Sequence, residues 1–174
     1  MDSNFDILGF IATGIPKCIL ITVGVLASLV SLLFLFGLKH KRQCIIYVWL
    51  IAYLFLMFYT TVFKREPHDD ILIHLKPFWS IQSIQDGCVE TFYEKTYNII
   101  FYIPYGILIG LRKKKIKTVV LIGFITSLTI EILQLMTRTG MCETDDVICN
   151  TFGCAVGAMI AIAICWAKRK IKNK

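Results

Sequence analysis

Glu131 is the residue whose position most strongly indicates a function. It lies inside an otherwise apolar stretch, residues 118–136, that is long enough to cross a membrane. A charged side chain at that depth costs roughly 2.5–3.5 kcal/mol even on lenient insertion scales, so it usually faces the interior of a helix bundle. Gln134 and Arg138 follow three and seven residues later, on the same helical face. This face predicts either a structural Glu–Arg pair or a binding or proton-handling site.

Asp146 and Asn150 begin a second polar face, four residues apart, at the start of another apolar stretch. Asp145 precedes them, and either aspartate would also suit a helix N-terminus, where acids complement the helix dipole. Below Asn150 the same face continues with three small residues, Gly153, Gly157 and Ala161. Such a seam of small residues predicts that another membrane helix approaches closely.

Asn98 and Arg65 are weaker candidates taken one at a time. Asn98 precedes Tyr102 and Tyr105 in a stretch whose Pro104 removes a backbone hydrogen bond and should bend a helix. A kinked packing helix is the alternative for Asn98. Arg65 follows an apolar stretch directly, and a snorkelling interfacial role is its alternative.

The candidates gain weight from their common location at one end of the predicted helices. The predicted binding residues are Arg65, Asn98, Glu131, Gln134, Arg138, Asp145, Asp146 and Asn150. Glu131 and Asp146 are also the candidate general bases of an enzyme. The seven cysteines form no CxxC pair, so neither a zinc site nor another metal or cofactor is predicted.

Long apolar blocks must position these residues. The chain has 174 residues, of which 56% are hydrophobic and 18% charged, more apolar than a soluble domain. The blocks predict an all-α integral membrane protein with five transmembrane helices and a long extracytoplasmic loop, residues 64–95, between the second and third helices. The predicted spans are residues 15–38, 45–63, 96–111, 118–136 and 147–167.

The basic residues predict the orientation of these spans. Thirteen of the 19 lysines and arginines fall in the two connectors and the tail on one side, which should be cytoplasmic. This places the N-terminus outside, the C-terminus inside and the polar residues on the extracytoplasmic side. Because the basic clusters flank apolar blocks, the net charge of +7 does not indicate a nucleic-acid partner. Cys88 and Cys142 fall in predicted outer loops, where a disulfide could form, although free thiols are favoured.

Several segments resemble the VanZ-like family of small bacterial membrane proteins. They include the segment Asn98 to Gly106 (NIIFYIPYG), EILQ from Glu131, and RTG from Arg138 followed by DDVICNTFG from Asp145. The segment KPFWSI from Lys76 and the arginine of FKRE also match. His74 and Glu143 depart from the family pattern, which more often has asparagine and aspartate there. The resemblance divides the chain into an N-terminal helix and connector (residues 1–44), a VanZ-like domain (45–167) and a basic tail (168–174).

The resemblance implies a role in resistance to teicoplanin, a lipid-bearing glycopeptide, and three hypotheses follow. In the first, the outer polar residues bind a lipid headgroup, a lipid-linked cell-wall precursor or a lipoglycopeptide. In the second, the protein is a membrane-embedded hydrolase or transferase acting on a phosphate-containing lipid, with Glu131 or Asp146 as base. In the third, it is a small transporter subunit, which five helices would support best as a homodimer. Membrane lipids are expected partners in each case.

Overall fold

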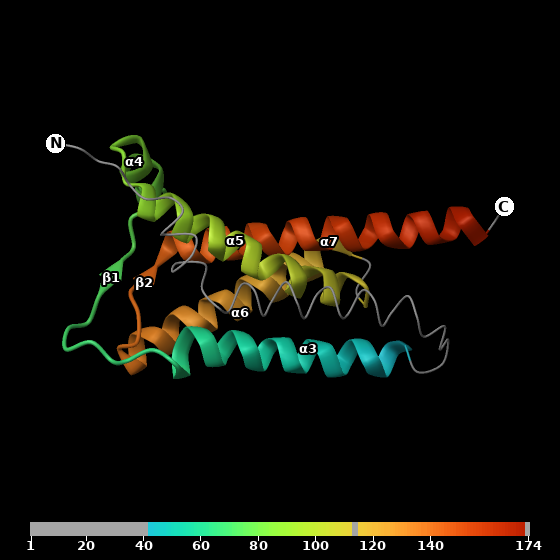
Figure 1. Cartoon of the computed structure of the whole chain (residues 1–174), viewed down its shortest axis with the longest axis horizontal. Helices are drawn as coiled ribbons and strands as arrows, with labels where there is room; N and C mark the ends of the chain where they lie inside the picture. Colours follow the sequence, from blue (N-terminus) through green and yellow to red (C-terminus); the bar gives the residue numbers. More distant parts are fainter. Residues whose placement is uncertain (1–41, 113–114, 173–174) are drawn as a thin grey trace, which may run out of the picture. The chain divides into compact units, whose positions relative to one another are not determined.

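The computed structural model describes residues 42–112 and 115–172 (Figure 1). The predicted first span, residues 15–38, lies outside these ranges. The described elements, in chain order, are α3 (Arg42–Phe58), the π-helix η1 (Tyr59–Phe63), β1 (Ile73–His74), α4 (Trp79–Gln85), α5 (Val89–Gly110), α6 (Ile116–Thr137), β2 (Cys142–Glu143) and α7 (Thr144–Lys172).

Three described helices are long and apolar enough to cross a bilayer. They are Gln43–Phe63, Ile116–Thr137 and Thr144–Ile171, and they correspond to the second, fourth and fifth predicted spans. The third predicted span corresponds to α5, which starts earlier, at Val89, and runs through Pro104 without interruption. Glu94, Lys95 and Asn98 make the first half of α5 too polar to belong to the same apolar set.

The outward surfaces of these helices are apolar. On α3, Val48, Ile51 and Phe55 are 65–68% exposed, and Leu121 and Ile125 on α6 are more than half exposed. Such a continuous apolar exterior would favour aggregation in water, but it suits helices that contact lipid.

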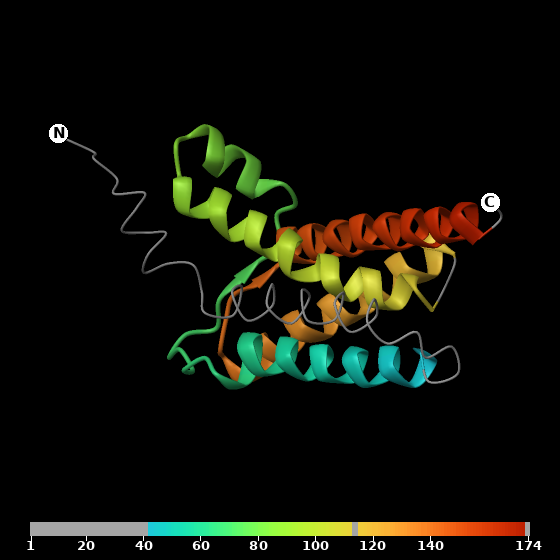
Figure 2. The ribbon, with the colours of Figure 1, turned by 45° about the vertical axis from the view of Figure 1, so that its right-hand side comes forward.

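A seam of small residues joins α5 to α7, as the sequence predicts. A Cβ atom added at Gly153 or Gly157 would collide with the backbone of α5 at Ile99 or Ile103, and one added at Gly106 would collide with the backbone of Cys154. The two helix backbones therefore touch directly, and Figure 2 shows α5 lying along α7. This contact fixes the relative height of the polar residues on the two helices.

The segment predicted as a long loop, residues 64–95, contains regular structure that the sequence analysis missed. It includes β1, α4 and the first turns of α5. β1 pairs in parallel with β2, with Ile73 opposite Cys142 and His74 opposite Glu143. Strands this short carry little signal in a sequence, because their pairing depends on a partner about 70 residues away.

The strands and α4 gather at one end of the described helices, which we call the sheet end (Figure 1). The α5–α6 connector and the C-terminal turns of α7 lie at the opposite end, which we call the basic end for its lysines and arginines. Cys88 and Cys142 both lie towards the sheet end and are free thiols, so the structure contains no disulfide between them.

Candidate functional site

Lys95 forms the centre of the buried charges at the sheet end. Its Nζ atom lies 2.5 Å from Glu143 Oε2 and 2.5 Å from Asp146 Oδ1. The side chains of Lys95 and Glu143 are each 6% exposed, and that of Asp146 is 16% exposed. The ammonium also lies 5.3 Å from the centre of the Trp79 ring, within the range of a cation–π contact.

Three elements bring these charges together. Lys95 stands on the second turn of α5 and Asp146 on the first turn of α7, and the small-residue seam holds these helices side by side. Glu143 belongs to β2, whose pairing with β1 sets the direction of the chain just before α7 begins. The sequence therefore positions one cation between two acids by packing two helices and one strand pair.

The ion pairs keep Lys95 protonated. Burial by itself would lower the pKa of the ammonium, but the charge of Asp146 and the hydrogen bonds to Asp146 and Glu143 raise it above its usual value. Lys95 is thus a permanent positive charge near neutral pH rather than a proton donor or acceptor.

Glu131 joins this group through the backbone of β2. Its carboxylate accepts a hydrogen bond from the Glu143 backbone N–H at 3.0 Å, and the residue is only 2% exposed. The helical spacing predicted Arg138 as its ion-pair partner, and Arg65 is the other arginine predicted for the site. Within the described residues, neither arginine forms an ion pair with Glu131, so that expectation is wrong.

The four residues Lys95, Glu131, Glu143 and Asp146 form what we call the acid-rich cluster. Glu143 and Asp146 contact the one ammonium, and Glu131 is held beside them through the Glu143 backbone; among the described residues, no second cation forms an ion pair with these three carboxylates. Buried carboxylates without a matching positive charge are unfavourable, because the interior solvates them poorly. The cluster can therefore accept a further positive charge.

A second polar layer lies one helical turn deeper. The Asn150 side-chain amide donates to Ser127 Oγ at 2.9 Å, linking α7 to α6 at positions four residues from Asp146 and Glu131. Asn150 Oδ1 and the Tyr102 hydroxyl are buried there without a hydrogen-bond partner. Unsatisfied buried polar atoms are rare and often mark a bound water or a functional group.

Asp145 has a different task from its neighbour Asp146. Its carboxylate accepts hydrogen bonds from the backbone N–H groups of Phe78 and Ser80 and from the Ser80 hydroxyl, at 2.6, 2.9 and 2.5 Å. Phe78 is held in a left-handed conformation, with φ of 60°. Asp145 therefore anchors the start of α4 at the sheet end, and its hydrogen bonds do not go to the first turn of its own helix.

The remaining predicted residues lie outside the acid-rich cluster. Gln134 donates to the Thr61 carbonyl of η1 at 3.1 Å, and the Arg65 guanidinium lies beside Gly140 and Gln134. Arg138 ends α6 in a left-handed conformation, is exposed, and donates to the Asp69 carbonyl at 3.3 Å. Because Arg138 lies beyond the end of the helix, its seven-residue spacing from Glu131 does not place the two side chains on one helical face.

Asn98 is half-buried on α5, three residues after Lys95. The sequence analysis missed Lys95, Glu143 and Ser127 as members of the site. One signal was available for Lys95, because its spacing to Asn98 and Tyr102 places all three on one helical face. Glu143 stands out only as the acid that replaces the aspartate usual in the family pattern.

A model of the VanZ/LLP1 family matches residues 44–166, which is most of the chain. The chain belongs to the VanZ/LLP1 family. Searches of curated proteins and of solved structures find no match. The region that matches the VanZ/LLP1 model contains the whole acid-rich cluster, Asn150 and Ser127, so these residues lie within the family domain and not in an added segment.

Proposed function

We propose that this VanZ/LLP1-family protein binds the amine-bearing polar head of an amphiphile at the acid-rich cluster. The candidate amphiphiles are a membrane lipid, a lipid-linked cell-wall precursor and a lipoglycopeptide. By binding one of these at the outer membrane surface, the protein would contribute to resistance to teicoplanin-type glycopeptides, a role with which family membership is consistent.

The observation that carries this proposal is the charge imbalance of the cluster. Glu143 and Asp146 share a single lysine, and the buried Glu131 carboxylate adjoins them through the Glu143 N–H without an ion-pair partner among the described residues. A ligand ammonium would supply the missing positive charge and could donate up to three hydrogen bonds to carboxylate oxygens. Among the described residues, no three His, Cys, Asp or Glu side chains are grouped so that they could hold a metal ion.

Sidedness is part of the same proposal. The sheet end would face the outside of the cell, because the lysines and arginines of the α5–α6 connector and the tail gather at the basic end. Asp146, the most exposed member of the cluster, would then be the first carboxylate that an approaching headgroup meets.

The enzyme hypothesis has less support. The Asp146 carboxylate is already engaged by the Lys95 ammonium at 2.5 Å, so it is not free to contact a substrate proton. Arg138, which would have held a phosphate, extends instead to the Asp69 carbonyl, and Arg65 lies beside Gly140. No specific contact in the described residues favours a transport path.

Glu131→Gln and Asn150→Ala test the proposal. Glutamine keeps an acceptor for the Glu143 N–H and removes one negative charge, while alanine fits the small-residue face of α7. Both variants should remain folded, as judged by thermal melting in detergent, and both should lose protection in a teicoplanin susceptibility assay. Glu94→Gln is the matched control, because Glu94 is 54% exposed and its contact with Lys95, at 3.9 Å, is much longer than those of the buried carboxylates, so this change removes a nearby charge without removing a buried acid.

Two results would count against the proposal. If Glu131→Gln and Asn150→Ala both protect cells as well as the unaltered protein, the cluster is purely architectural. If Glu94→Gln loses protection to the same extent, the effect reflects general surface charge and does not require the buried carboxylates.

A further inference from the structure

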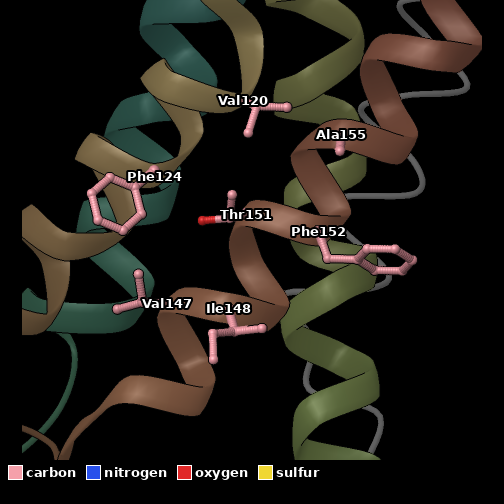
Figure 3. A pocket seen from close by; sticks show the side chains of 7 residues that line it. All are labelled: Val120, Phe124, Val147, Ile148, Thr151, Phe152 and Ala155. Carbon is pink, nitrogen blue, oxygen red and sulfur yellow. The ribbon is translucent and has the colours of Figure 1, made fainter. Parts of the chain in front are cut away.

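An apolar groove opens between α6 and α7. It has a volume of about 370 Å³, within the range of small-molecule sites. Val120 and Phe124 line it from α6, and Val147, Thr151 and Ala155 are among the residues that line it from α7 (Figure 3). Both helices are among those apolar enough to cross a membrane, so the groove would open to the hydrocarbon region.

The groove leads towards the acid-rich cluster. On α6, the spacing from Val120 and Phe124 continues through Ser127 to Glu131 in steps of four, three and four residues, along one face. On α7, the lining residue Val147 directly follows Asp146 and comes four residues after Glu143. A molecule lying in the groove would therefore have one end close to the buried carboxylates.

We propose that this groove holds an aliphatic chain of the amphiphile whose head binds the cluster. The inference rests on the proposed function for the identity of the head. That the other part of the ligand is an apolar chain follows from the groove lining. Its lining is apolar except for Thr151, whose hydroxyl oxygen is buried without a hydrogen-bond partner. Because the groove would open to the hydrocarbon region, a chain tethered to a bound head would enter it without passing through water.

The rim of the groove favours a chain over a transmembrane helix as the occupant. Two aromatic side chains lie at this rim (Figure 3). They are Phe124 from α6, which is 42% exposed, and Phe152 from α7, which is 57% exposed. Closely packed membrane helices instead meet at small residues, as α5 and α7 do at Gly153 and Gly157. A methylene chain is narrow enough to lie between bulky side chains that would hold a helix away.

Photolabelling of the full-length protein tests this inference. The first probe is a phosphatidylethanolamine with a diazirine in the middle of one acyl chain, at low density in phosphatidylcholine vesicles. The second probe carries the same chain on phosphatidylglycerol, which has no amine. We expect adducts of the first probe to concentrate on the peptides that contain Thr151 and Ala155, as mapped by mass spectrometry.

Ala155→Phe supplies the matched perturbation. A phenyl ring at this lining position would fill the slot and lower groove labelling by about tenfold. Ala163→Phe is the control, because Ala163 is exposed on the same helix, two turns further on and outside the groove. It should leave groove labelling unchanged. Should Ala155→Phe fail to fold, the labelling map of the unaltered protein still decides the question.

Two outcomes would overturn the groove as a chain site. Labelling spread evenly over lipid-facing residues such as Ile125 and Met159, and insensitive to Ala155→Phe, would show ordinary surrounding lipid only. Groove residues that neither probe labels would show that protein occupies the slot, either residues 15–38 of this chain or a second copy.

The two probes separate this inference from the proposed function. Equal groove labelling by both probes would support the chain site and contradict an amine-specific head site. Preferential binding of the ethanolamine probe without groove labelling would support the head site and overturn the chain site.

Discussion

Lys95 is the residue on which the arrangement at the sheet end depends most. It contacts Glu143 and Asp146 and lies next to the Trp79 ring, so it joins α5, β2, α7 and the start of α4. Without its charge, these elements would bring carboxylates together with nothing to balance them. The residue therefore serves stability, while the carboxylate excess around it serves binding.

Replacing Lys95 with methionine should destabilise the protein strongly. Methionine preserves the length of the side chain but leaves two buried carboxylates unpaired, a change that typically costs about 3–5 kcal/mol. The measurement is the free energy of unfolding in mixed detergent micelles. Lys76→Met is the control, because Lys76 is exposed in the same outer segment. Equal stability of the two variants would contradict the central role of Lys95.

The same residue gives a pH dependence whose sign is fixed. The folded pKa of Lys95 lies above its unfolded value of about 10.4, so its contribution is fully present below that pH. The contribution is lost only as the pH rises through the folded pKa. Stability curves of the native protein and of Lys95→Met should therefore keep a constant separation across neutral pH and converge only in strong alkali.

At the scale of elements, the contact between α5 and α7 determines the fold. Alanine normally stabilises a helix relative to glycine by up to about 1 kcal/mol. At Gly153 and Gly157, however, the added Cβ would press on the backbone of α5. The two effects have opposite signs, so a substitution shows which of them dominates.

Gly157→Ala should destabilise the protein by about 1–3 kcal/mol, the usual cost of overpacking. Thermal melting in detergent would measure this loss. Ala163→Leu provides a comparison on the exposed side of α7 and should melt close to the unaltered protein. If Gly157→Ala melts at a higher temperature than the unaltered protein, helix propensity dominates and the close backbone contact is not required.

The elements differ in how well the sequence predicts them. Apolar length alone locates α3, α6 and α7, and the spacing of Gly153, Gly157 and Ala161 predicts the close helix contact. The start of α5 was placed seven residues too late, because the charges of Glu94 and Lys95 resemble a loop until their partners are known. β1, β2 and α4 depend on pairing and anchoring by distant residues, which no local pattern reveals.

The candidate site was predicted in part for a related reason. Glu131, Asp146 and Asn150 were candidates because polar residues stand out against apolar helices, and the structure places them in the cluster or one turn below it. Their partners were not candidates, because a partner is defined by the fold: Glu143 reaches the site through β2. Arg138 was expected on the same helical face as Glu131, but α6 ends before it and its backbone is left-handed.

For the whole molecule, two features of different chemistry share the helices α6 and α7. The acid-rich cluster at the sheet end could take a cationic head, and the groove between α6 and α7 could take a chain in the hydrocarbon region. A ligand with a cationic head and an aliphatic chain would lie with its head at the membrane surface and its chain in the hydrocarbon region, as a membrane lipid does. Recognition would then need no opening of the helix bundle beyond the sheet end.

The most direct measurement of the central claim is the stabilisation of the purified protein by a single-chain lipid that carries an amine. A ligand that binds only the folded state raises the stability by about 2.7 kcal/mol at a concentration one hundred times its Kd. The melting temperature of the native protein and of Glu94→Gln should rise with added lysophosphatidylethanolamine and not with lysophosphatidylglycerol. Asp146→Asn, which keeps an acceptor for Lys95, should lose the effect. Equal stabilisation by both lipids, or an undiminished response of Asp146→Asn, would contradict an amine site at the cluster.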